Sequence, residues 1–148
     1  MLTGRCPFRG RKLSEARLTN LWLEWYRFRQ VAHMTDPNCL FCRILRGEIP
    51  AKKIYEDSHV FAFEDINPQA PTHVLIIPKE HFAGLKEAEA DHAEVIGRCH
   101  LAAAEIARQR KIENGYRTVL NVGPGAGQSV FHLHVHLLGG RSLTWPPG

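Results

Sequence analysis

The chain has 148 residues, enough for one domain and an appendage but not for two full-sized domains. Its hydrophobic share of 44% and charged share of 23% are ordinary for a globular protein and exclude wholesale disorder. Residues 1–33 hold seven Lys or Arg against two Glu, whereas the remainder holds twelve Lys or Arg against thirteen acidic residues, so the main body lacks the basic footprint of a nucleic-acid-binding domain.

The first segment, residues 1–34, differs in character from the rest. It is rich in arginine and aromatic residues, and one apolar stripe recurs at helical spacing (Leu18, Leu21, Trp22, Trp25, Phe28 and Ala32). Three interpretations stay open: an amphipathic helix that docks on a membrane or partner, an organelle transit peptide, or a disordered or artefactual extension ahead of a natural start at Met34. We expect a domain boundary here, with the folded domain at residues 35–148.

From residue 38 onward, the sequence pattern indicates a regular succession of short elements. The pattern predicts a short helix over 38–46 stopped by Gly47, a hairpin of strands 53–56 and 59–63, a buried strand over 73–77, a long helix over 88–111, a strand over 116–121, a glycine-rich loop over 123–127 and a last strand over 130–138. Hairpins and one long helix, without strict strand–helix alternation, predict an α+β fold with a mainly antiparallel sheet.

Three histidines alternate within the last predicted strand. His132, His134 and His136 would share one face of the strand about 7 Å apart, with aliphatic residues on the other face. A scattered histidine is usually a satisfied, partly buried side chain, but an alternating triple behind a glycine loop favours a functional site. Residue chemistry alone leaves a metal site and a nucleophilic site as alternatives.

Four cysteines are too few for a disulfide-dense secreted protein, so we expect a reducing, cytoplasmic location. Cys39 and Cys42 have the C-x-x-C spacing of metal or redox chemistry, although two thiolates supply only half of a tetrahedral site. The plain alternative is two reduced thiols on a short helix. No apolar run approaches the ~20 residues of a membrane span, and the start lacks the continuous apolar stretch of a secretory signal, so no membrane association is expected for 35–148.

The segment from His132 to Leu138 resembles the motif for which the histidine triad (HIT) family is named. Further similar motifs follow in the right order, namely residues 47–52, 68–73 and 127–129. The C-terminal stretches 139–141 and 145–148 resemble the Hint branch of nucleoside phosphoramidate hydrolases, formerly described as protein kinase C inhibitor-like. The resemblance runs from about Asn38 to Gly148 and leaves out the first 34 residues.

The resemblance implies a hydrolase of purine nucleoside 5′-phosphoramidates, such as AMP–amine conjugates, acting through a nucleotidyl-histidine. His134 would be the nucleophile, since a neutral imidazole can attack phosphorus near pH 7. His136 would stabilise the phosphate, Ser129 would lie near the leaving amine, and His73 would support the triad. Backbone N–H groups of Gly127, Gln128 and Ser129 would hold phosphate oxygens.

For the nucleoside, the resemblance implies that Asp65 accepts the ribose hydroxyls and that Asn121 lies near the phosphate or ribose. The base would lie in an apolar slot formed by Phe41, Ile44, Phe63 and Ile66. The chemistry of these residues permits plainer interpretations, because an aspartate here also suits a turn and apolar side chains also suit a core.

Some bacterial-type HIT proteins complete a zinc site with two histidines, which here would be His81 and His132. Cys39, Cys42, His81 and His132 would then form a closed, structural Zn²⁺ site. Animal Hint proteins generally lack this cysteine pair, so the chain combines a Hint-like end with a zinc-type beginning. Cys99 is expected in the core, Cys6 is expected to be incidental, and no organic cofactor is expected.

Two alternative functions stay open. One is a dinucleoside polyphosphate hydrolase of the same family, and the other is a nucleotide-binding interaction module without catalysis. The resemblance also implies a homodimer in which two five-stranded sheets join into a ten-stranded one, with Trp145 as an apolar anchor near the partner's site.

Overall fold

The computed structural model describes residues 36–147, so the predicted N-terminal extension over 1–34 lies outside the described residues. The elements in chain order are helix α2 (Leu40–Leu45), strands β1 (Lys53–Glu56), β2 (Val60–Glu64) and β3 (Thr72–Pro78), a 3-10 turn (Ala90–His92), helix α3 (Ala93–Gln109), strand β4 (Tyr116–Val119), a second 3-10 turn (Pro124–Ala126) and strand β5 (Val135–Gly139). The predicted α+β class and the type of each element are confirmed.

The five strands form one sheet in the order β1-β2-β3-β5-β4, and every neighbouring pair is antiparallel. β5 lies between β3 and β4, where His136 is opposite Leu75 on one side and Val119 on the other. The prediction of a last strand over 130–138 is wrong at its beginning. Residues 130–134 are irregular, so His132 and His134 precede the strand and only His136 belongs to it.

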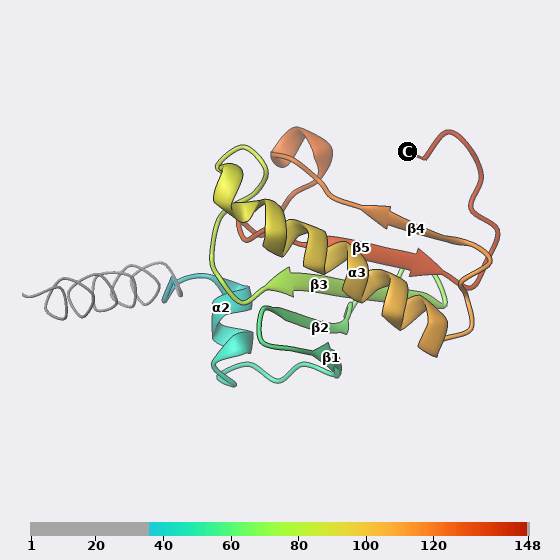
Figure 1. Ribbon diagram of the computed structural model, residues 1–148, viewed down its shortest axis with the longest axis horizontal. Coiled ribbons are helices and arrows are strands. Elements are labelled where there is room, and N and C mark those ends of the chain that lie inside the picture. Colours follow the sequence, from blue (N-terminus) through green and yellow to red (C-terminus); the bar gives the residue numbers. More distant parts are fainter. Residues whose placement is uncertain (1–35, 148) are drawn as a thin grey trace, which may run out of the picture. The chain divides into compact units, whose positions relative to one another are not determined.

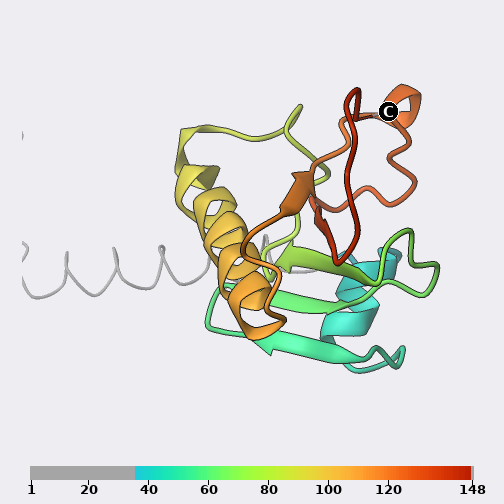
Figure 2. The same cartoon turned by 90° about the vertical axis from the view of Figure 1, so that its right-hand side faces the viewer.

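Alternation along the strands divides the sheet into two buried faces. One face packs its aliphatic residues, such as Val74, Ile76 and Val135, against α3, which lies across the sheet in Figure 1. The other face packs Leu75 and Ile77 against α2, which Figure 2 shows on the opposite side of the sheet from α3. His136 has the strand parity of the α2 face, so the histidine site is built on the side away from the long helix.

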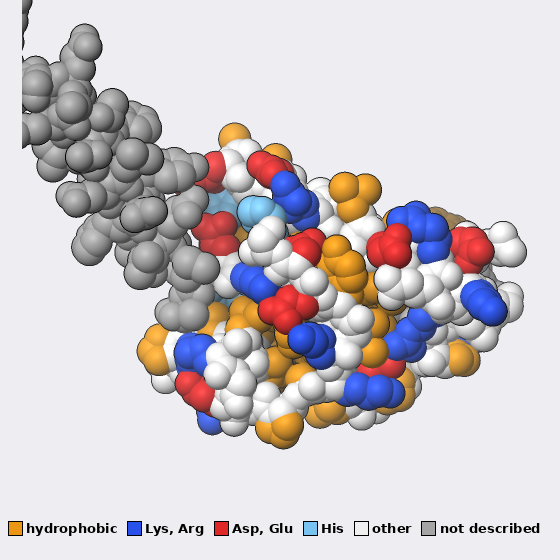
Figure 3. Space-filling model, turned by 60° about the horizontal axis from the view of Figure 1, so that its bottom comes forward, with side chains coloured by type: hydrophobic (Ala, Val, Ile, Leu, Met, Phe, Trp, Pro, Cys, Tyr) orange, Lys and Arg blue, Asp and Glu red, His pale blue; other side chains and the backbone are white. Residues whose placement is uncertain are grey.

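Charged side chains are mixed over the surface. On the face shown in Figure 3, basic and acidic groups alternate and do not gather into a patch of one sign. Several are paired, for example Glu56 with Lys53 and Lys79 at 3.0 and 2.8 Å. Such exposed pairs contribute little to stability, but their mixing fits the near-neutral body expected from the sequence. Within residues 36–147, no helix has the length and apolarity needed to cross a membrane.

Candidate metal centre and histidine site

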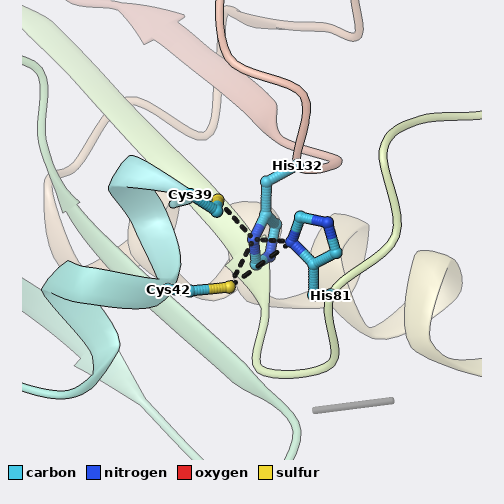
Figure 4. Close-up of side chains that lie close together, drawn as sticks. All are labelled: Cys39, Cys42, His81 and His132. Carbon is cyan, nitrogen blue, oxygen red and sulfur yellow. Dashed lines mark hydrogen bonds between the residues drawn. The ribbon is translucent and has the colours of Figure 1, made fainter. Parts of the chain in front are cut away.

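Four side chains from three segments point toward one another in Figure 4. Cys39 and Cys42 come from the start of α2, His81 from the loop after β3, and His132 from the irregular segment before β5. Their ligand atoms all lie within 4.8 Å of one another, and three of the four side chains are buried. We call these four residues the cysteine–histidine cluster, and the structure brings together the set predicted from the resemblance.

The distances within this cluster suit a tetrahedral zinc ion. Bonds of about 2.3 Å to sulfur and about 2.0–2.1 Å to nitrogen would separate N and S ligand atoms by about 3.5–3.6 Å and two N atoms by about 3.3–3.4 Å. Nδ1 of His132 lies 3.5 Å from Sγ of Cys39 and 3.6 Å from Sγ of Cys42. Nδ1 of His81 lies 3.4 Å from Sγ of Cys42 and 3.3 Å from Nδ1 of His132. The residues therefore fit the ion.

The protonation of His132 also favours a ligand role. Its Nε2 donates to the carbonyl of Pro78 at 2.9 Å, so in the neutral ring the lone pair is on Nδ1, the atom directed into the cluster. Burial lowers the pKa of His132 to about 4, so the ring is neutral at pH 7. Burial raises the pKa of Cys42 to about 11, and a buried cation is what would favour its thiolate.

The ring of His134 is oriented by the backbone of the same segment. Its Nδ1–H donates to the carbonyl of His132 at 2.8 Å, which leaves the lone pair on Nε2. Burial lowers the pKa of His134, so the neutral, nucleophilic form predominates at pH 7. The ring lies 5.0 Å from that of His136 and 5.3 Å from that of Phe41 between centroids, both in edge-to-face contact.

His73 and His136 form a chain of directed hydrogen bonds, which we call the histidine chain. The backbone N–H of Gln69 donates to Nδ1 of His73 at 3.1 Å, so the proton of neutral His73 is on Nε2. That Nε2 lies 2.9 Å from Nδ1 of His136 and 3.3 Å from Oδ2 of Asp65. Nδ1 of His136 therefore accepts, and the proton of neutral His136 is on Nε2.

The end of the histidine chain is a donor without an acceptor. Nε2 of His136 is buried and has no hydrogen-bond partner within the described part of the chain. Burial lowers the pKa of His136 to about 4, and the neighbouring His134 and His73 add to this effect. A buried donor left unpaired costs about 1–3 kcal/mol, so an anionic oxygen that accepted this hydrogen bond would be favoured.

The triad histidines lie on one side of the sheet, the α2 side, as the sequence predicts, while Leu133, Val135 and Leu137 pack on the α3 side. His132 points into the cysteine–histidine cluster, while His134 and His136 contact each other beside it. The alternation of side chains therefore extends to residues 132–134, although these residues are irregular and are not paired in the sheet. Phe41 of α2 makes edge-to-face contacts with the rings of both His132 and His134, at 5.9 and 5.3 Å between centroids.

The residues predicted to bind the nucleoside are placed unevenly. Asp65 accepts from the backbone N–H of Asn67 at 2.8 Å through Oδ1, which confirms a turn-forming contact, while Oδ2 faces His73. Phe41 and Phe63 are buried against each other in the α2-side core, and Ile44 packs partly buried beside them. Ile66 is fully exposed. A role for these side chains toward a base stays a prediction.

The glycine loop is held together by Gln128. The Gln128 side chain accepts from the N–H of Gly123 at 2.8 Å and donates to the carbonyl of Ala83 at 2.6 Å. The backbone N–H groups of Gly127 and Gln128, predicted to bind phosphate, donate to carbonyls of the loop itself at 3.0 and 3.2 Å. Ser129 is exposed, and Asn121 lies partly buried beside Gly127. Among the three predicted backbone donors, Ser129 is the one without such a bond in the described residues.

The backbone groups that orient the imidazoles are functional groups that the sequence does not indicate. These are the carbonyl of Pro78, the N–H of Gln69 and the carbonyl of His132 itself. Every residue type has such groups, so no sequence pattern could have indicated them.

Comparison with known proteins agrees with this geometry. The HIT domain family matches residues 46–143 of the chain. The 14 kDa zinc-binding protein of Zea mays is 51% identical over 117 residues, covering 78% of this chain and 91% of that protein. Adenylylsulfatase HINT1 of Arabidopsis thaliana is 45% identical over 116 residues, covering 77% and 79%. The crystal structure of a HIT family hydrolase from Legionella pneumophila is 51% identical with a TM-score of 0.73, covering 75% of this chain and 100% of that one.

Proposed function

The chain belongs to the HIT family, and from this premise we propose that it is a hydrolase that cleaves purine nucleoside 5′-phosphoramidates through a nucleotidyl-His134 intermediate. The observation that carries the proposal is the pair of fixed protonation states: His134 has a lone pair on Nε2, and His136 beside it has an unpartnered N–H. A nucleophile and a donor for a phosphate oxygen are the two groups that attack at phosphorus requires.

In the first step Nε2 of His134 attacks the α-phosphorus, the P–N bond breaks, and the amine departs with a proton taken up from solvent water. Nε2–H of His136 donates to a non-bridging phosphate oxygen, which gains charge as the attack proceeds. In the second step water attacks the same phosphorus and gives up a proton to solvent, the bond to Nε2 of His134 breaks, and the nucleoside monophosphate is released. Ser129 is proposed beside the leaving amine, and Asp65 at the ribose, on the family resemblance alone.

We propose that the cysteine–histidine cluster holds a structural Zn²⁺. The donor set of two thiols and two imidazoles has tetrahedral spacing, and a relative at 51% identity is named a zinc-binding protein. All four positions are protein ligands, so the ion would have no open position for substrate. Its role is to join α2, the loop after β3 and the segment before β5.

A second candidate activity follows from the relative named adenylylsulfatase, at 45% identity. Adenylyl sulfate carries its leaving group on the same α-phosphorus, so His134 and His136 would perform the same steps with sulfate departing in place of an amine. A dinucleoside polyphosphate would present the same phosphorus with a longer phosphate chain. The three substrates differ in the leaving group and not in the attacking residue.

The experiment compares turnover of an AMP–lysine conjugate, adenylyl sulfate and diadenosine polyphosphate by the wild type and by His134→Ala. We expect the AMP–lysine conjugate to be cleaved fastest, and His134→Ala to lose about 10³-fold or more of that activity while nucleotide binding is largely kept. His100→Ala is the matched control, since His100 is exposed on α3 on the other side of the sheet. Rapid quenching and mass spectrometry should detect a nucleotidyl adduct on His134.

Binding of nucleotide with no turnover of any of the three would instead identify an interaction module. Fastest cleavage of diadenosine polyphosphate would assign the chain to that branch of the family. Homodimerisation and a cytoplasmic location also stay predictions. The apolar side chain of Trp145 is 84% exposed and is available to a second copy of the chain.

A further inference from the structure

His132 belongs to both sites at once. Its side chain directs Nδ1 into the cysteine–histidine cluster, and its backbone carbonyl accepts the hydrogen bond from Nδ1–H of His134 at 2.8 Å. The side chain is fully buried. A single residue therefore links the position of the cluster to the orientation of the proposed nucleophile.

The peptide group between His132 and Leu133 is also held through its N–H, by the residue that follows His81. The N–H of Leu133, in the same peptide plane as the His132 carbonyl, donates to the carbonyl of Phe82 at 2.8 Å. Phe82 directly follows His81. Segments 81–82 and 132–133 are thus joined twice, once through the imidazoles of the cluster and once through this backbone hydrogen bond.

Within residues 36–147, no strand pairing holds the His132 carbonyl in place. Residues 130–134 are irregular, and the sheet begins only at Val135. A third contact comes from α2, where Phe41 lies between the two cysteines in sequence and packs edge-on against His134 at 5.3 Å. The hydrogen bond of the His134 ring and its contact with Phe41 therefore both lead to segments that carry cluster residues, while its contact with His136 leads to β5.

We propose that His132 is a positioning residue for His134, and that a metal ion bound by the cysteine–histidine cluster orients the nucleophile in addition to stabilising the fold. The inference rests on the proposed function insofar as His134 is the nucleophile. Loss of the ion would leave the Leu133–Phe82 backbone hydrogen bond to join segments 81–82 and 132–133 without the second link, and the His132 carbonyl would be held less firmly toward Nδ1–H of His134. The ring could then rotate and present the protonated nitrogen.

The test compares zinc-loaded full-length protein with the same protein after chelation, using the ¹H–¹⁵N NMR signal of the His134 Nδ1–H. We expect this signal in the loaded protein and its loss on chelation, together with a fall in kcat of about 10–100-fold at a nucleotide Kd changed less than about twofold. The NMR signal reports the ring itself, so it remains informative even if no substrate is turned over, which separates this inference from the proposed function.

His81→Ala is the second arm, because it removes the cluster residue next to Phe82 and leaves Cys39, Cys42 and His132 to hold the ion. We expect it to stay folded by circular dichroism and to lose the His134 Nδ1–H signal. Cys99→Ala is the control for a substitution outside the cluster, since Cys99 is a buried thiol in the α3-side core, and it should keep the signal. An unchanged signal in folded metal-free protein or in folded His81→Ala overturns the proposal. Unfolding in both arms also overturns it, because the ion would then support the whole fold and not one imidazole.

Discussion

The cysteine–histidine cluster and the histidine chain are two groups of imidazoles on the same side of the sheet, yet they suit opposite chemistry. The histidine chain and the neighbouring carboxylate also bring three possible ligand atoms within 4.8 Å of one another, those of Asp65, His73 and His136. In the cysteine–histidine cluster, however, Nε2–H of His132 donates to the carbonyl of Pro78, so the lone pair on Nδ1 faces inward. In the histidine chain, the backbone N–H of Gln69 donates to Nδ1 of His73, so the proton of neutral His73 is on Nε2 and faces inward.

This difference teaches that the partner of the far nitrogen decides what an imidazole presents. A carbonyl on the far side gives a metal ligand, and an amide N–H on the far side gives a hydrogen-bond donor. The histidine chain would have to lose the Gln69 hydrogen bond before Nε2 of His73 could bind a cation. We therefore expect one metal site and one proton-directed site, and three changes test that distinction in addition to the experiments above.

The largest effect is expected from deleting a cluster ligand. Cys42→Ala should lower the free energy of unfolding by about 3 kcal/mol or more, because metal binding by a folded site adds directly to stability. Cys99→Ala, a buried thiol outside the cluster, should cost only about 1 kcal/mol. Urea unfolding measures both variants. Elemental analysis should give about one zinc per wild-type chain. A second zinc per chain that is lost in Asp65→Asn would show that the histidine chain also binds metal, and would contradict the distinction between the two groups.

A smaller effect is expected from acid. The pKa of His136 is lowered to about 4 in the folded chain, whereas an unfolded histidine titrates near about 6.5. Between these values the unfolded chain binds more protons, so the free energy of unfolding should fall as the pH decreases from about 6.5 to about 4, by about 1–3 kcal/mol for this residue.

The measurement is the difference between wild type and His136→Asn across this pH range. Titration of the cysteine–histidine cluster is common to both proteins and cancels in the difference. Parallel pH profiles for the two proteins would show that His136 is not held neutral by burial.

The smallest effect is expected within the histidine chain. His73→Gln can still donate to Nδ1 of His136, whereas His73→Asn can still accept from the Gln69 N–H but is too short to reach His136. Loss of one such hydrogen bond costs about 1 kcal/mol. We expect His73→Asn to reduce kcat by about tenfold and His73→Gln to reduce it less. The ¹⁵N shifts of His136 report whether its proton stays on Nε2. Equal reductions of kcat in the two variants would contradict the proposed direction of the hydrogen bonds in the histidine chain.

Much of the fold could be predicted because it follows from local patterns. The short helix ends ahead of Gly47, which has φ +75°, the hairpin and β3 lie where alternation and β-branched residues indicate them, and α3 follows the apolar stripe that includes Cys99 and Ile106. The error at the last strand has a physical cause. Residues 130–134 have the alternating pattern of a strand, but pairing with β3 begins only at Val135, and the N–H of Leu133 donates to the carbonyl of Phe82 in the loop after β3 instead.

The candidate site was predictable in its residue types and less so in its geometry. The C-x-x-C pair and the histidine triple are visible as spacing patterns, and they indicate most of the side chains of the two groups. The hydrogen bonding of the glycine loop could not be predicted, because the N–H groups of Gly127 and Gln128 donate within their own loop, and such bonds depend on the fold of the turn. The buried packing of Phe41 against Phe63 likewise depends on how α2 lies on the sheet.

The amino-acid sequence by itself determined which groups are available: the succession of helices and strands along the chain, the apolar faces that must be buried, and the cysteines and histidines that carry the chemistry. Only the tertiary structure decided which nitrogen of each histidine holds the proton. That choice is made by backbone groups of Pro78, Gln69 and His132, two of which lie 54 and 4 residues from the rings they orient. Backbone carbonyls and amides are the same at every position, so their effect arises from proximity in the folded chain and leaves no trace in the sequence.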